Sequence, residues 1–188
     1  MFRMDFKIAL LIILAIFAAA SLIGGLFVFV SPDSGKLLVE MMREQFVGTV
    51  IDTEGFILPL KIFLNNLQAC TLLFLGGASF GLLTLFIILM NGVVIGGVLE
   101  VVREQQSLLY VAAAVLPHGA FEIPSFVVSG ALGIMLADAL YREWFKEGNA
   151  AEDALHLGRI FLMVVVPLLV VAALVEAFIT PEIINLVI

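Results

Sequence analysis

Apolar residues occur along the chain in long runs that short polar stretches separate. The first run extends from Ile8 to Pro32 without a charged side chain, and Arg3 and Lys7 precede it. About 20 consecutive apolar residues are enough for a helix to cross a bilayer. The pattern therefore predicts a first membrane-spanning helix at about 8–30, which is longer than the apolar core of a signal peptide.

A more polar stretch follows the first predicted span. Between residues 34 and 48, leucine, methionine and phenylalanine recur at helical spacing, with charged residues between them. This pattern is typical of an amphipathic helix that lies at the membrane interface. We expect such a helix at about 34–48, and a loop from Asp52 to Pro59.

The next apolar run, from Ile62 to Leu99, contains 38 residues and no charge. As one helix it would be about 57 Å long, whereas the hydrocarbon core of a bilayer is about 30 Å thick. The run therefore predicts two spans, at about 60–76 and 79–102, with the break at the sequence Gly-Gly-Ala-Ser.

The run from Ser107 to Leu140 is too long for one straight span and too short for two ordinary ones. Pro117 and Pro124 lie inside it. Proline lacks an N–H and disrupts regular helix, and backbone groups freed at membrane depth need protein or water as partners. We therefore predict a span at about 107–142 whose backbone is broken or re-entrant at 117–124.

A last apolar run predicts a fifth span at about 159–180, and the composition supports the membrane class. Of the residues, 63% are hydrophobic and 13% are charged, whereas soluble domains are about half apolar and a quarter charged. The sequence thus predicts a single all-α domain over residues 1–188, a polytopic helical bundle whose partner is the lipid bilayer. The net charge of −7 argues against nucleic acid as a partner.

The positive charges give a small bias in orientation. Cytoplasmic loops usually carry an excess of lysine and arginine, and a cytoplasmic N-terminus places five of them inside and four outside. We therefore expect a multi-pass protein of the cell membrane with its N-terminus in the cytoplasm. The inner set is Arg3, Lys7, Arg142, Lys146 and Arg159, and the outer set is Lys36, Arg43, Lys61 and Arg103.

Two ionisable residues stand out in the fourth predicted span. Between Gln105 and Ala137, His118 and Glu122 are accompanied only by the weakly acidic phenol of Tyr110. Ionisable groups at membrane depth are costly and are candidates for function. Because they are four residues apart, the two side chains lie on one face of a helix.

Three interpretations of this pair stay open. First, Glu122 accepts a hydrogen bond from His118 and the pair satisfies the broken backbone, which we favour because buried polar groups must have partners. Second, the pair binds a divalent metal or other cation together with Glu100 or Asn91, and the metal ligands would then be His118, Glu122 and Glu100. Third, the pair relays protons or acts as acid and base on a membrane substrate. No residue can be assigned a catalytic role.

Other polar and small residues extend the candidate site. Asn66 and Asn91 lie in apolar runs, where asparagine most often links helices by hydrogen bonds. Glu100 either joins the site or pairs with Arg103 at the end of its helix. Two small-residue motifs predict close helix packing, within the chain or across a homodimer. Their residues are Gly77, Gly81, Gly92 and Gly96.

The segments Leu64-Asn65-Asn66, Asn91-Gly92 and above all Pro117-His118-Gly119 with Glu122-Ile123-Pro124 resemble the stage II sporulation protein M family of polytopic membrane proteins. The resemblance covers about residues 60–140. It implies a membrane organiser that holds cell-envelope protein partners, in spore formers two peptidoglycan-degrading ones, without an assigned chemistry. It also implies a shared polar site where the two asparagines, the histidine and the glutamate converge.

Two functions follow as expectations. The first is a membrane scaffold or transport-like component with a buried polar site at His118 and Glu122. The alternative is an intramembrane, metal-dependent hydrolase that acts on a lipid or a peptide, although the common hydrolase motifs are missing from the sequence.

Overall fold

The computed structural model describes residues 4–47, 57–145 and 148–187. All regular elements within these residues are helices, and five of the helices are long and apolar enough to cross a membrane. The prediction of an all-α, five-span polytopic bundle is confirmed. Most of the predicted loop at 52–59 lies outside the described residues.

The chain begins with a long helix and a shorter one. α1 (Phe6–Val30) starts at Asp5, whose carboxylate accepts a hydrogen bond from the Lys7 backbone N–H at 2.8 Å. α2 (Pro32–Val47) follows directly after Ser31 and packs against α1 and α4. It covers the stretch in which we predicted the amphipathic helix.

The third and fourth helices are joined at the glycine-rich break. α3 (Ile57–Leu75) leads into the single 3-10 turn η1 (Gly76–Ser79), and α4 (Leu82–Gln105) begins after two residues with left-handed backbone. One of these is Gly81, with φ of 84°, a conformation that glycine adopts without steric cost. Gly81 therefore lies in the chain reversal before α4, and it is also close to α5, because an added Cβ would meet Ile134 Cδ1 at 3.2 Å.

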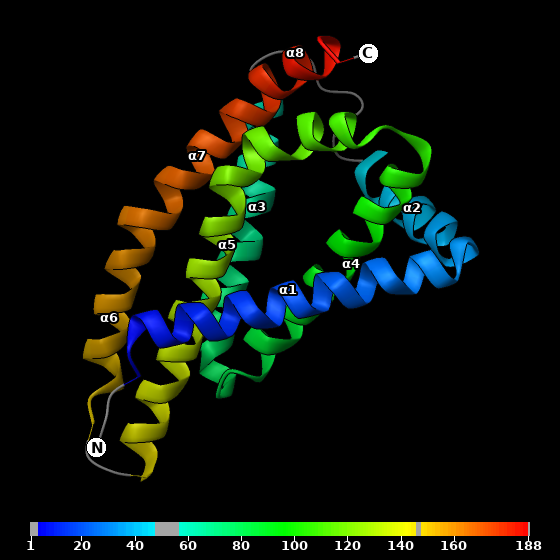
Figure 1. Cartoon of the computed structure of the whole chain (residues 1–188). Coiled ribbons are helices and arrows are strands. Elements are labelled where there is room, and N and C mark those ends of the chain that lie inside the picture. The colour runs from blue at the N-terminus through cyan, green and yellow to red at the C-terminus, as the bar shows by residue number, and fades with distance from the viewer. Residues whose placement is uncertain (1–3, 48–56, 146–147, 188) are drawn as a thin grey trace.

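α5 (Leu108–Phe145) corrects the prediction of a broken span. It is one 38-residue helix with Pro117 and Pro124 inside it, so the backbone break or re-entrant segment predicted at 117–124 is wrong. In Figure 1 the first turns of α5 run across the bundle, and the helix then bends sharply and runs along it. Bending is the usual response of a helix to an internal proline.

The last predicted span is part of a longer helical rod from Ala150 to Asn185. Two π-helical turns interrupt its α-helical hydrogen bonding, and each is followed two residues later by a proline, Pro167 or Pro181. A proline clashes with the carbonyl four residues before it, and in both cases that carbonyl lies in the widened turn. The segments are α6 (Ala150–Ile160), η2 (Phe161–Val165), α7 (Val166–Leu174), η3 (Val175–Ile179) and α8 (Thr180–Asn185).

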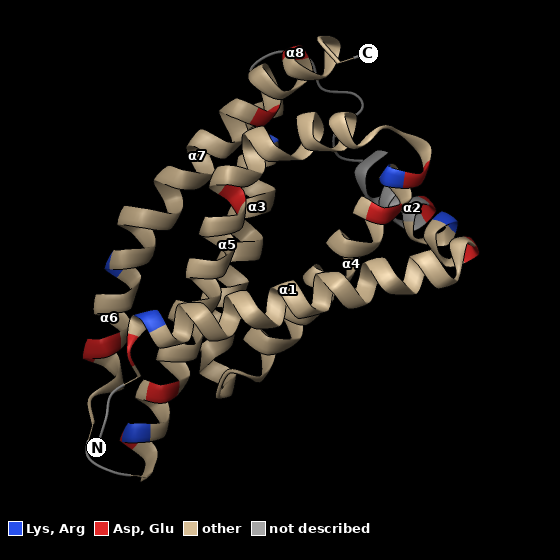
Figure 2. Cartoon of the chain, viewed as in Figure 1, with Lys and Arg blue, Asp and Glu red and all other residues tan. Residues whose placement is uncertain are grey.

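α5 is the central helix of the fold. Half of its most apolar window is buried, against 22–28% for the other four candidate spans. Its side chains contribute to both apolar clusters, one with α3 and the final rod and one with α1, α3 and α4. Figure 2 shows that charged residues gather mostly near the ends of the long helices, with long stretches free of Lys, Arg, Asp and Glu between them.

Candidate functional site

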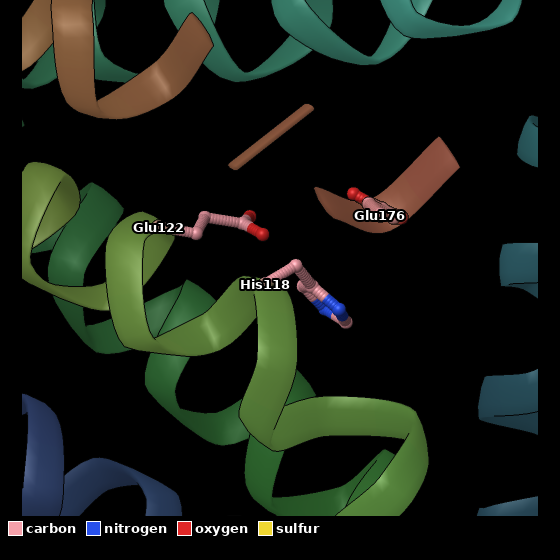
Figure 3. Close-up of side chains that lie close together, drawn as sticks. All are labelled: His118, Glu122 and Glu176. Carbon is pink, nitrogen blue, oxygen red and sulfur yellow. The ribbon is translucent and has the colours of Figure 1, made fainter. Parts of the chain in front are cut away.

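His118, Glu122 and Glu176 come together although the last two are 54 positions apart in the sequence. One ligand atom from each of the three side chains lies within 4.8 Å of the other two. Figure 3 shows the Glu122 and Glu176 carboxylates pointing toward each other from two helical segments, with the His118 imidazole beside them. We refer to these three residues as the polar triad.

The bend in α5 places the first two members. Pro117 comes directly before His118 inside α5, and it lacks the N–H that a regular helix would use at this position. His118 and Glu122 are one helical turn apart, so both side chains project from the same face of α5. The shared face is what the sequence spacing predicted, and in the structure this face lies toward the neighbouring rod.

The third member comes from the π-helical turn η3. A π turn holds an extra residue, so it changes the direction in which its side chains point, and such turns are frequent at functional sites. Glu176 is half-buried in this turn. Thr180, one turn further along, is buried, and its Oγ1 lies 3.5 Å from Nδ1 of His118.

The polar triad lies well inside its helices. His118 is ten residues after the first residue of α5, and Glu176 is nine residues before Asn185, which correspond to about 15 Å and 14 Å of helix. All three side chains are half-buried. The arrangement offers one imidazole and two carboxylates, a donor set that suits a cation.

The other predicted site residues lie elsewhere. Both carboxylate oxygens of Glu100 accept hydrogen bonds from Arg103, at 2.6 and 2.7 Å. Of the two expectations for Glu100, the structure therefore shows the ion pair with Arg103 at the helix end. Asn91 donates a hydrogen bond to the Ile87 carbonyl of its own helix, at 2.9 Å. The structure therefore brings Glu176, and not Glu100, beside His118 and Glu122.

Asn66 is half-buried on α3 and does not belong to the triad. Within the part of the chain that the structure describes, the recorded contact of the His118 imidazole is with Thr180 and not with Glu122. The favoured hydrogen bond between His118 and Glu122 is therefore not formed in this structure.

Gly92 and Gly96 pack inside the chain. A Cβ added at Gly92 would meet the Cβ of Ala20 at 2.6 Å, and one at Gly96 would overlap the Ser21 carbonyl. Both contacts are with α1, so these glycines are already covered. A homodimer therefore stays a prediction that would need another face.

The fold and the triad define a polytopic helical membrane protein with an imidazole and two carboxylates gathered between two of its spans. The chain belongs to the stage II sporulation protein M family, which matches residues 10–181. This result confirms the resemblance found in the sequence. An uncharacterized protein of Methanocaldococcus jannaschii is 27% identical over 180 residues, which cover 94% of this chain and 96% of that protein. No solved structure matches the chain.

Proposed function

We propose that the protein is a transport-like component of the membrane, in which the polar triad binds a small cation on its way across. The observation that supports this most is the convergence of three ionisable side chains from two separate apolar helices. Ionisable groups cost free energy in a bilayer and mark ion pathways and proton relays. Two carboxylates beside one imidazole give a site that attracts cations.

The helices that carry the triad also support this function. α5 contains two prolines, and the final rod contains two π turns. Transporters often bind ions where helices are interrupted, because carbonyls and side chains become free there. Both triad-bearing helices can bend at these points at lower cost than a regular helix can.

The test is a flux measurement with the full chain in liposomes. Two probes are used separately: protons, followed with a trapped pH-sensitive dye, and Mn²⁺, followed by quenching of a trapped fluorophore. We expect the wild type to pass at least one probe faster than protein-free vesicles, and Glu176→Gln to reduce this flux by more than about tenfold, since it removes a binding charge.

Glu182→Gln is the matched control. Glu182 lies in the same rod, six residues from Glu176, but it is exposed, so the same change of charge should leave the flux at the wild-type level. A wild type no faster than protein-free vesicles would contradict the transport proposal. It would favour the scaffold role, in which the protein holds envelope partners and needs no flux.

A second candidate function is an intramembrane metal-dependent hydrolase. Glu176 favours it, because three protein ligands with an open position are the arrangement of catalytic zinc sites. The hydrolase proposal predicts that zinc-loaded protein releases a fluorescent fatty acid from a phospholipid reporter, and that Glu122→Gln abolishes the release. Release no faster than with zinc alone would contradict it.

A further inference from the structure

We infer that the polar triad is a binding site for a first-row divalent transition-metal ion, such as Zn²⁺, Mn²⁺ or Fe²⁺. The inference rests on the proposed function, since it names the class of cation that the same site accepts. It combines the geometry of the three ligand atoms, the chemistry of the donors and the position of a neighbouring hydroxyl.

The geometry is close to what such an ion requires. An equilateral triangle with the 4.8 Å limit as its side has its centre about 2.8 Å from each corner. Zinc binds histidine nitrogen and carboxylate oxygen at about 2.0–2.2 Å. Each ligand atom therefore has to move inward by at most about 0.6–0.8 Å to reach a bound zinc ion.

The donor types narrow the choice of ion. Calcium and magnesium prefer sites made of oxygen alone, whereas an imidazole favours zinc, iron and their neighbours, and carboxylates also suit manganese. The triad offers one nitrogen and two carboxylates, so it fits a first-row transition metal better than Ca²⁺ or Mg²⁺. Three protein ligands leave positions open for water or exchange.

Thr180 supplies an orienting group for the imidazole. Metal-binding histidines usually use their second ring nitrogen to bond a neighbouring group, which fixes the orientation of the ring. Thr180 Oγ1 lies 3.5 Å from Nδ1 of His118, so Nδ1 has a partner at the long limit of a hydrogen bond. An ion bound at Nε2 would leave Nδ1 available for this contact with Thr180.

Equilibrium binding to the full chain in detergent tests the inference. Co²⁺ serves as the probe because its visible absorption reports its ligands, and Zn²⁺ is then added as a competitor. After equilibrium dialysis, elemental analysis gives the number of ions per chain. We expect one ion per wild-type chain, displaced by Zn²⁺ but not by an equal concentration of Mg²⁺, and binding weakened by more than about tenfold in His118→Gln and in Glu176→Gln.

Two exposed residues provide matched controls. His156→Gln and Glu182→Gln make the same chemical changes outside the triad, at side chains that are exposed, and they should retain wild-type binding. No retained ion in the wild type would overturn the inference, as would equal binding by His118→Gln. The absence of an ion from the wild type overturns the inference even if a triad variant fails to fold.

Binding and flux separate the two proposals. An ion held at the triad without flux in liposomes would contradict transport and leave the metal site standing. Proton flux that depends on Glu176, in a protein that retains no Co²⁺ or Zn²⁺, would contradict the metal site and leave transport standing.

Discussion

The contact between α1 and α4 offers the sharpest test of the packing. This pair shares the most extensive contact between any two elements, and glycines line it on both sides. A Cβ at Gly96 would overlap the backbone carbonyl of Ser21, and one at Gly24 would overlap the carbonyl of Val93. Since backbone atoms cannot rotate away, we expect Gly96→Ala to push the two helices apart.

The magnitude follows from two opposing effects. Overpacking a tight contact costs about 1–3 kcal/mol, and the backbone overlap places Gly96→Ala near the upper end. Alanine is more favourable than glycine in a helix by about 1 kcal/mol. The free energy of unfolding should therefore fall by about 2 kcal/mol in Gly96→Ala. A Cβ added at Gly158 would have no atom within 4 Å, so Gly158→Ala should raise the free energy of unfolding by up to about 1 kcal/mol.

Thermal unfolding in detergent, followed by circular dichroism, measures the difference. In proteins of this size 1 kcal/mol shifts the melting temperature by about 2–4 °C. A separation of about 3 kcal/mol therefore predicts that Gly158→Ala melts roughly 6–12 °C above Gly96→Ala. If Gly96→Ala melted at or above the wild type, the close approach of α1 and α4 at this residue would be refuted.

Two further predictions concern polar contacts that hold the fold together. Thr84→Val removes the buried hydrogen bond from Oγ1 to the Leu73 carbonyl, 2.8 Å long, and should cost about 1 kcal/mol in thermal unfolding; an unchanged melting temperature would contradict a structural role for it. Arg142→Gln breaks the ion pairs with Asp138 and Asp153, at 3.0 and 2.7 Å. Because these side chains are only 16–18% exposed, we expect a loss of about 1.5–3 kcal/mol and a melting temperature less sensitive to salt than that of the wild type. Equal salt sensitivity would argue against the ion pairs.

The number of spans could be predicted because bilayer thickness limits helix length. The run without charge around α1 matches the length of one crossing, and the single run that contains most of α3 and α4 matches two. The break at Gly76–Ser79 was visible as two glycines followed by small residues. The packing of glycines could not be predicted in the same way. The motif at Gly92 and Gly96 indicated a close approach, but nothing in it pointed to α1 as the partner.

The continuity of α5 could not be read from the positions of its prolines. Pro117 and Pro124 each remove one backbone donor, and sequence alone does not show whether the neighbouring turns hold. In the structure Ser125 donates to the Phe121 carbonyl at 2.7 Å, and Ser129 donates to the Ser125 carbonyl at 2.8 Å. Such hydroxyl bonds add partners for the backbone next to a kink, as expected where water is scarce.

Glu176 was missed although the sequence held a signal for it. It is the one ionisable residue between Phe161 and Thr180, so the criterion that selected His118 and Glu122 also applies to it. What the sequence could not give is its direction, because the π turn that carries it shifts the helical register. Both helices of the polar triad are irregular at the triad itself, through Pro117 in α5 and the π turn before Pro181 in the rod. Because π turns are frequent at functional sites, the coincidence of ionisable groups and irregular backbone on both sides is one of the reasons for proposing a cation site here.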